Sequence, residues 1–232
     1  MKINDLKKYF DLYEISYDDQ KVAELDALMH STLEMNEKFN LTAIKDEDVF
    51  VEKMILDSAI ALKDLDLDDK KIIDIGTGAG YPGMVLAILS NANVTLLDST
   101  KKKIDYLVDY SKEHNIHING VSMRAEDYAK EHRESLDYAF ARAVASLNIL
   151  IELIVPMLKV GGYFIALKGA GYEEEINNSI NAFKKLNCHI ESIFETELPE
   201  SKEKRAIIRI KKDKETNKKY PRQYSDIKKL PL

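Results

Sequence analysis

A glycine-rich stretch near residue 78 limits the possible folds most strongly. It runs Ile72-Ile73-Asp74-Ile75-Gly76-Thr77-Gly78-Ala79-Gly80-Tyr81-Pro82-Gly83. A short apolar run ends beside an acid and is followed by alternating glycines, which accept the backbone angles of a sharp turn and allow close approach to a ligand. Pro82 suits the first turn of a helix. The pattern predicts a buried parallel strand, a ligand-binding loop and then a helix.

The same stretch is compatible with more than one ligand. Gly78, Gly80 and Gly83 match the dinucleotide fingerprint, and Asp98 lies about 20 residues further on, where a ribose-binding acid is expected. However, a carboxylate at Asp74 would repel a pyrophosphate and attract an ammonium group. S-adenosylmethionine has that ammonium group and no phosphate, so it is the predicted ligand. A nicotinamide or flavin nucleotide, or a turn that binds nothing, remains as an alternative.

From residue 71 onward, strand-like and helix-like segments alternate, which is typical of a doubly wound α/β sheet. We predict strands at 71–75, 93–98, 118–123, 136–141, 162–168, 188–198 and 204–211, and helices at 82–90, 100–114, 126–133, 147–159 and 172–187. No helix separates the last two strands, so they should form a hairpin. The expected fold is a Rossmann-like, seven-stranded, mostly parallel sheet with an antiparallel last strand, as in class I S-adenosylmethionine-dependent methyltransferases.

The chain divides into three predicted parts. Residues 1–65 form an N-terminal helical extension, with a second helix expected over 48–63. Residues 66–212 form the methyltransferase domain. Residues 213–232 form a basic tail.

Ligands of such sheets bind beyond the carboxyl ends of the strands. The candidate donor-binding residues at those ends are Asp74, Gly76, Gly78, Gly80, Tyr81, Asp98, Ser99, Ala125, Glu126 and Arg142. Asp98 can accept hydrogen bonds from ribose hydroxyls, or it could cap the helix that follows. Glu126 could likewise be a first-turn acid that complements the helix dipole. Lys168 ends a later strand at the same edge.

Composition excludes several other classes of protein. The chain has a net charge of −6 and one cysteine, Cys188, and it contains no HExxH motif, so we predict no metal site and no disulfide. It has no apolar run of about 18 residues, and we expect a cytoplasmic monomer without membrane association. From Lys211 to Leu232, eight basic residues oppose three acidic ones, giving a local charge of +5. Lys218, Lys219 and Arg222, together with Lys168, are predicted RNA-binding residues, unless the tail is only a solvated end.

The missing motifs limit the chemistry. Where amine methylases of nucleic acids have an Asp/Asn-Pro-Pro-aromatic motif, this chain has Ala139-Phe140-Ala141-Arg142. Cys188 is expected in the core rather than at a pyrimidine C5 methylation site. A nucleophile with a free lone pair, such as a purine N7, needs no general base, so Arg142 is expected to position the substrate or the donor.

Seven segments together resemble the ribosomal RNA small subunit methyltransferase G family, also called glucose-inhibited division protein B. They are Asn40-Leu41-Thr42-Ala43-Ile44, Ile55-Leu56-Asp57-Ser58, the run from Asp74 to Gly83, Leu97-Asp98-Ser99, Arg124-Ala125-Glu126, Ala141-Arg142-Ala143-Val144-Ala145 and Tyr220-Pro221-Arg222. The resemblance extends from about residue 30 to the C-terminus.

This resemblance implies a function. The family's donor-binding positions correspond to Gly76, Tyr81, Ala125, Glu126 and Arg142, with Asp98 at the ribose. The implied reaction is N7 methylation of one guanosine in the decoding-region loop of bacterial 16S rRNA, with S-adenosylmethionine as donor and S-adenosylhomocysteine as product. The partner would be 16S rRNA or the small ribosomal subunit. A methyltransferase acting on a small molecule or protein, and a non-catalytic ribosome-assembly factor, remain as alternatives.

Overall fold

The computed structural model describes all 232 residues. Its centre is one seven-stranded sheet with the strand order β3-β2-β1-β4-β5-β7-β6. The strands are β1 (Lys71–Ile75), β2 (Asn93–Asp98), β3 (Ile118–Ser122), β4 (Leu136–Arg142), β5 (Leu158–Lys168), β6 (Cys188–Glu197) and β7 (Lys204–Lys212). Six strands run in one direction and β7 runs in the opposite one, since it pairs antiparallel with both β5 and β6. The sheet is therefore the predicted class I methyltransferase sheet.

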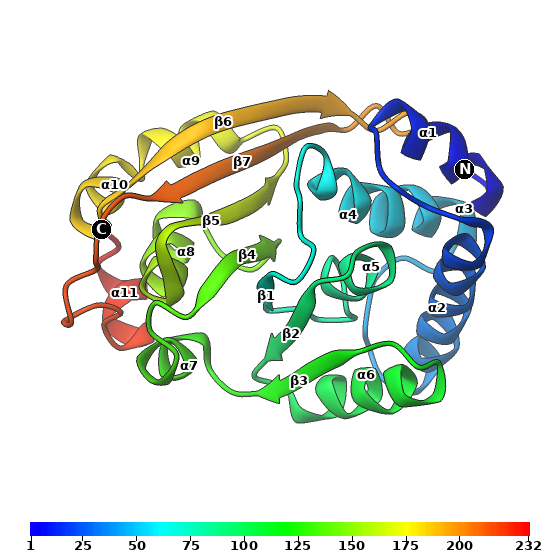
Figure 1. Ribbon diagram of the computed structural model, residues 1–232, viewed down its shortest axis with the longest axis horizontal. Coiled ribbons are helices and arrows are strands. Elements are labelled where there is room, and N and C mark those ends of the chain that lie inside the picture. Colours follow the sequence, from blue (N-terminus) through cyan, green and yellow to red (C-terminus); the bar gives the residue numbers. More distant parts are fainter.

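Helices cover both faces of this sheet (Figure 1). One layer packs α2 (Asp19–Lys38), α5 (Gly83–Leu89) and α6 (Lys101–Glu113) into a core of 36 buried residues. The other packs α7 (Ala125–Glu131), α8 (Leu147–Ile154), α10 (Ile180–Leu186) and α11 (Tyr224–Lys229) into a core of 26. The apolar residues of each central strand alternate between these cores, as the two-residue period of a strand requires.

The N-terminal helical extension is part of the first layer. It consists of a 3₁₀ turn (Ile3–Asp5), α1 (Leu6–Leu12), α2, α3 (Glu47–Phe50), a π-helical segment (Val51–Leu56), α4 (Asp57–Ala59) and a 3₁₀ turn (Ile60–Leu62). The predicted helix over 48–63 thus exists, but its hydrogen bonding changes along its length. Leu25, Phe50 and Ile55 are fully buried against the same core as the sheet, so the extension and the sheet form one hydrophobic unit.

Two predicted segments differ from the structure. The single helix expected over 172–187 is two helices, α9 (Tyr172–Asn177) and α10, with a break at Asn178–Ser179. The predicted helix over 147–159 is shorter in the structure, since α8 ends at Ile154. A 3₁₀ turn, Val155–Met157, follows it and contains Pro156. Proline lacks an N–H donor and interrupts the regular hydrogen bonding there.

The C-terminal residues do not form a solvated arm. Tyr220 is 5% exposed and Ile227, in α11, is fully buried in the second core. Arg133 Nη2 donates to the Thr216 carbonyl oxygen at 2.7 Å. Residues 213–232 therefore pack against the domain (Figure 1), which rules out the alternative of a disordered end. No helix combines the length and the apolarity needed to span a membrane.

Candidate functional site

A cleft of about 1000 Å³ opens at the carboxyl ends of the parallel strands. Its lining comes from the N-terminal helices, the glycine-rich loop, the ends of β2, β4 and β5, and β7. The polar and glycine residues that line it are Lys53, Asp57, Gly76, Thr77, Gly78, Asp98, Lys103, Arg142, Ser146, Lys168, Gly169, Glu175 and Arg205, with Tyr81 at its inner wall. Six of the predicted site residues therefore share one cleft: Gly76, Gly78, Tyr81, Asp98, Arg142 and Lys168.

The glycine-rich loop is held by hydrogen bonds from its own backbone. The N–H groups of Gly76 and Thr77 both donate to the Leu97 carbonyl oxygen, at 2.8 and 3.0 Å. Gly76 and Gly78 have φ angles of +68° and +59°, a region in which side chains are strained. A Cβ at Gly76 would come within 2.6 Å of the Val144 side chain, whereas Gly78 faces open space. The loop thus presents bare backbone to the cleft at Gly78.

Gly80 has a different role, because it packs against the core. A Cβ at this position would come within 2.7 Å of Met84 and 2.8 Å of Leu107. Gly80 does not line the cleft, and its predicted contact with a donor stays a prediction.

Asp74 lies beneath the glycine-rich loop and is 1% exposed. Its Oδ2 accepts hydrogen bonds from Thr77 Oγ1 at 2.6 Å and from the Gly83 N–H at 2.8 Å. Its other oxygen, Oδ1, is buried without a hydrogen-bond partner. Burial raises the pKa of this carboxyl to about 6. Asp74 therefore anchors the loop from below. It does not line the cleft, and its predicted contact with a donor stays a prediction.

Asp98, at the end of β2, holds the loop from the other side. One oxygen accepts the Gly78 N–H at 3.1 Å, and the other accepts the Thr100 N–H at 2.8 Å. Thr100, rather than Asp98, is the N-cap of α6. Asp98 is therefore not the helix cap that was the alternative prediction, although it fixes the residue just before the helix. The carboxylate also lines the cleft, and each oxygen has a further lone pair that a ligand hydroxyl could use.

Arg142, at the end of β4, crosses the cleft to the N-terminal helices. One Nη donates to the Lys53 carbonyl oxygen at 2.9 Å and to Asp57 Oδ2 at 3.3 Å. Asp57 Oδ1 accepts from Arg205 Nε at 3.0 Å, so two guanidinium groups share this buried carboxylate. Asp57 and Arg205 were not among the predicted site residues. Asp57 lies in one of the family-like segments, which was the available signal, whereas Arg205 had none.

Lys168, at the end of β5, is 8% exposed and paired within the protein. Its Nζ donates to Glu175 at 2.6 Å and to the Ala145 carbonyl oxygen at 2.9 Å. Glu175 also accepts the Leu147 N–H at 2.7 Å. Lys168 therefore joins the end of β5 to the start of α8, and the sequence did not identify Glu175 as its partner.

Tyr81 is 3% exposed and belongs to the core as much as to the cleft. Its hydroxyl lies 3.3 Å from Thr32 Oγ1, and its ring meets that of Phe50 edge to face at a centroid distance of 5.4 Å. The ring of Tyr81 is thus held in place by α2 and α3, and its predicted contact with a donor stays a prediction.

The remaining predicted donor residues, Ser99, Ala125 and Glu126, do not line the cleft. Ser99 is exposed after β2, and Ala125 and Glu126 begin α7. Their donor-binding roles stay predictions.

The predicted RNA-binding residues of the tail lie apart from the cleft lining. Lys218 and Lys219 are exposed, and Lys219 Nζ lies 5.1 Å from the centre of the Tyr220 ring. Arg222 is bound internally instead, because both its backbone and its guanidinium donate to the fully buried carboxylate of Glu152. The structure thus gives Arg222 a packing role that the sequence did not indicate.

Comparison with known families identifies the chain. The family model described as rRNA small subunit methyltransferase G matches residues 21–208. The chain belongs to this family. A relative from Fusobacterium nucleatum, named ribosomal RNA small subunit methyltransferase G, is 41% identical over 98% of this chain and 100% of its own length. One of the same name from Thermoanaerobacter pseudethanolicus is 45% identical over 86% of this chain and 85% of its own.

Solved structures share the fold at low sequence identity. TYW2 from Pyrococcus horikoshii, in complex with MeSAdo, has a TM-score of 0.54 and 11% identity over 68% of this chain and 62% of its own. TYW2 from M. jannaschii, in complex with AdoMet, has a TM-score of 0.53 and 14% identity over 64% of this chain and 71% of its own. These similarities agree with the class I methyltransferase sheet, and family membership rests on the sequence matches.

Proposed function

We propose that this member of the methyltransferase G family transfers a methyl group from S-adenosylmethionine to N7 of one guanosine in the decoding-region loop of 16S rRNA. The observation that carries the proposal is the combination of family membership with a large polar cleft at the carboxyl ends of the strands. We expect the enzyme to act in the cytoplasm, where ribosomes assemble, and to release S-adenosylhomocysteine.

The cleft has the features that the donor requires. Asp74, buried beneath the loop with its Oδ1 unpartnered, is the carboxylate that we expect to balance the donor's ammonium group, and Gly78 leaves backbone uncovered for close approach. Asp98 can accept hydrogen bonds from ribose hydroxyls. The donor has no phosphate, and the cleft-lining carboxylate nearest the glycine-rich loop, Asp98, would repel the pyrophosphate of a dinucleotide. These features favour S-adenosylmethionine over a dinucleotide.

The protein's part in the reaction is orientation. The donor supplies a methyl group already activated by a positively charged sulfur, and N7 of guanine has a free lone pair, so no side chain must remove a proton. Holding two reactants in line can contribute about 7–11 kcal/mol to lowering a barrier. Arg142 is suited to this task because its ion pair with Asp57 and its bond to the Lys53 carbonyl oxygen limit its motion.

A covalent mechanism has no support in the chain. Cys188 is the only cysteine, and it is buried at the start of β6. Burial raises the pKa of its thiol to about 12, so almost none is ionised near neutral pH. The expectation of a core cysteine is confirmed.

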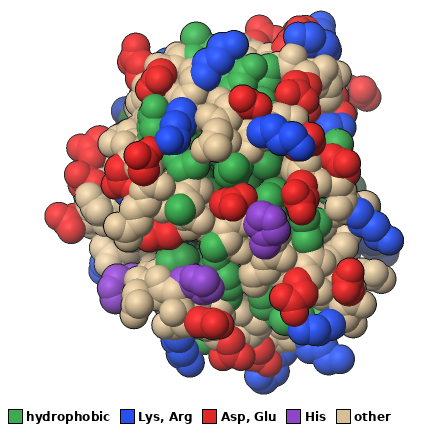
Figure 2. Space-filling view, turned by 90° about the vertical axis from the view of Figure 1, so that its right-hand side faces the viewer, with side chains coloured by type: hydrophobic (Ala, Val, Ile, Leu, Met, Phe, Trp, Pro, Cys, Tyr) green, Lys and Arg blue, Asp and Glu red, His purple; other side chains and the backbone are tan.

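The RNA should approach the cleft rather than the helical face. Figure 2 shows acidic, basic and histidine side chains intermingled on the side that carries the N-terminal helices, without the single-sign patch that favours RNA backbone. Five cationic side chains line the cleft itself: Lys53, Lys103, Arg142, Lys168 and Arg205. Most of them are paired with carboxylates of the protein, as Arg142 and Arg205 are with Asp57, so we expect the RNA to find a cleft of mixed charge with a small positive excess.

A direct test of the function uses cells with and without this gene. Mass spectrometry of digested 16S rRNA should find one N7-methylguanosine in the decoding-region loop that is lost with the gene and restored by expressing it. The pure protein should transfer labelled methyl groups to small subunits from the deleted strain. An unchanged rRNA, together with methyl transfer to a small molecule or protein, would support the alternative substrate class.

Replacing Asp98 with alanine should weaken donor binding by about 1–3 kcal/mol, because it removes charge-assisted hydrogen bonds to the ribose. Titration calorimetry with S-adenosylmethionine measures this change. Thermal unfolding is the necessary companion measurement, since Asp98 also holds the Gly78 and Thr100 N–H groups. If only the melting temperature falls and donor affinity is unaltered, Asp98 is a loop anchor and not a ribose ligand.

Donor affinity should depend on pH through Asp74. The pKa of this carboxyl is raised from 3.8 to about 6, so its protonated form stabilises the fold below about pH 4, and that contribution is lost as pH rises through 6. Donor binding should respond in the opposite sense, because only the ionised form balances an ammonium charge. We expect donor affinity to fall by up to about tenfold per pH unit below pH 6.

The control for this pH dependence is Asp74→Asn, which keeps the shape of the side chain and cannot ionise. Its donor affinity should be lower and nearly flat between pH 5 and pH 7, an interval set by the pKa of about 6. A wild-type profile as flat as that of the variant would mean that Asp74 serves the loop alone.

A further inference from the structure

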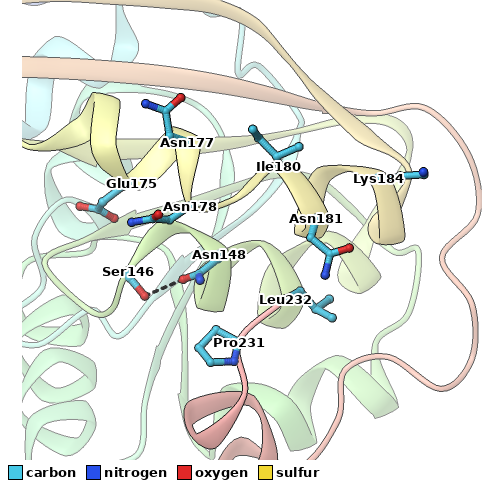
Figure 3. A pocket seen from close by; sticks show the side chains of 10 residues that line it. All are labelled: Ser146, Asn148, Glu175, Asn177, Asn178, Ile180, Asn181, Lys184, Pro231 and Leu232. Carbon is cyan, nitrogen blue, oxygen red and sulfur yellow. Dashed lines mark hydrogen bonds between the residues drawn. The ribbon is translucent and has the colours of Figure 1, made fainter.

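A second pocket, of about 730 Å³, adjoins the cleft (Figure 3). It is lined by Ser146, Asn148, Glu175, Asn177, Asn178, Ile180, Asn181, Lys184, Pro231 and Leu232. Ser146 and Glu175 line the cleft as well. A polymer that places one residue in the cleft can therefore place a neighbouring residue in this pocket without leaving the protein surface.

The pocket is rich in side-chain amides. Asn148 lies in the first turn of α8 and lines the pocket. Its Oδ1 accepts hydrogen bonds from Ser146 Oγ at 2.7 Å and from the Ile149 N–H at 2.9 Å. These bonds orient the amide and leave its NH₂ group available. Asn178 and Asn181 are exposed, and in Figure 3 neither is joined by a hydrogen bond to another residue of the pocket. Three amides thus offer unused donors and acceptors to the same space.

The local helix structure accounts for their placement. The chain breaks at Asn178–Ser179 between α9 and α10, and in α10 Ala182 and Leu186 face the core while Asn181 faces the pocket. Asparagine is a poorer helix former than alanine by a few tenths of a kcal/mol, and it favours turns. Helix stability therefore does not account for Asn181, whereas Asn178 lies at the helix break, where asparagine is favoured.

The chemistry of the pocket matches a base better than a phosphate. An asparagine amide pairs a donor with an acceptor, as the edges of nucleobases do. Ile180 is 66% exposed and, with Pro231, provides an apolar surface that a base could cover. Lys184 is the one cationic side chain that lines the pocket, at its outer end, and the one carboxylate side chain, that of Glu175, is already paired with Lys168. The pocket thus has no cluster of positive charge for a phosphate backbone.

We propose that this pocket, between the start of α8 and the break before α10, binds the base of an unpaired nucleotide next to the methylated guanosine. The proposal rests on the proposed function and adds to it a second contact that selects the RNA. Asn148, Asn178 and Asn181 read the edge of the base, and Lys184 lies where the adjoining phosphate leaves the pocket. An unpaired loop suits this arrangement, because its bases can turn outward into separate pockets.

The test compares Asn178→Ala/Asn181→Ala with the wild type on small subunits from a strain lacking the gene. A base-edge contact is typically worth about 5- to 150-fold in discrimination, so kcat/KM should fall by about tenfold or more, with donor affinity unchanged. Alanine is the better helix former in place of Asn181 but removes a turn-favouring residue at Asn178, so the two effects oppose each other and the melting temperature should stay close to that of the wild type. Asn119→Ala, an exposed asparagine of the edge strand β3, is the matched control and should keep wild-type kcat/KM.

A second substrate set makes the assignment specific. The substrates are subunits whose 16S rRNA carries a changed base either just before or just after the target guanosine. For one of these two positions, the change should make the subunit a poor substrate for the wild type. The double variant should no longer distinguish that change. Equal kcat/KM for the double variant and Asn119→Ala would overturn the proposal. The proposal would also be overturned if the double variant had a lower kcat/KM on every subunit but still distinguished the changed base as the wild type does. Failure of the wild type to methylate any subunit would instead reject the proposed function.

Discussion

Replacing Arg222 with alanine is expected to lower the free energy of unfolding by about 3–5 kcal/mol, the usual cost of breaking a buried ion pair from one side. Glu152 is fully buried in α8 and accepts three hydrogen bonds from Arg222, from the backbone N–H at 3.0 Å, Nε at 2.7 Å and Nη2 at 2.6 Å. The variant keeps the backbone N–H bond and loses the two bonds from the guanidinium, so the buried carboxylate is left without its counter-charge. Urea unfolding measures the loss.

Lys218→Ala is the matched control, because Lys218 is exposed in the same segment. Its stability should stay within about 0.5 kcal/mol of the wild type. Glu152→Gln combined with Arg222→Met should recover part of the stability lost in Arg222→Ala, since no uncompensated charge remains. Unchanged stability in Arg222→Ala, with a smaller salt dependence of subunit binding, would return Arg222 to the RNA-binding role that the sequence predicted.

Replacing Arg142 with alanine should lower kcat/KM for methylation of small subunits by about 100-fold, the size of effect expected when a positioning group is lost. The guanidinium spans the cleft between the end of β4 and the N-terminal helices through the Lys53 carbonyl oxygen and Asp57. Removing it frees both walls and takes a positive charge from the cleft. Single-turnover kinetics on unmethylated subunits would separate this loss from product release.

The fold should survive this change, because Asp57 keeps its ion pair with Arg205 at 3.0 Å. Arg142→Lys tests geometry against charge. It retains the charge but has one nitrogen in place of the planar guanidinium, whose second Nη lies 3.2 Å from Met54 Sδ, so its activity should lie between those of wild type and Arg142→Ala. Full activity in Arg142→Ala would exclude Arg142 from the site and leave orientation to the other cleft residues.

The layered fold could be predicted from the chain because its determinants are local. Alternating apolar runs, glycine turns and short helices repeat along residues 71–212, and each of the seven predicted strands overlaps an observed one. The glycine-rich loop with Asp74 and Asp98 was likewise predictable, since parallel strands bring their carboxyl ends to one edge. The helix break at Asn178–Ser179 was not, because a run of polar residues is compatible with either a helix or a turn.

By itself, then, the sequence determined the order of the strands and helices along the chain, the family and the position of the glycine-rich loop. Only the tertiary structure decided which charges are free and which are paired. Lys168 and Arg222 both appear as available cations in the sequence, yet one bonds to Glu175 and the other to Glu152, 70 residues away along the chain. Asp57, in turn, meets Arg142 and Arg205 from distant segments. Charge in a sequence specifies what a side chain can bind, whereas burial and distance, which arise only when the chain packs, determine what it does bind.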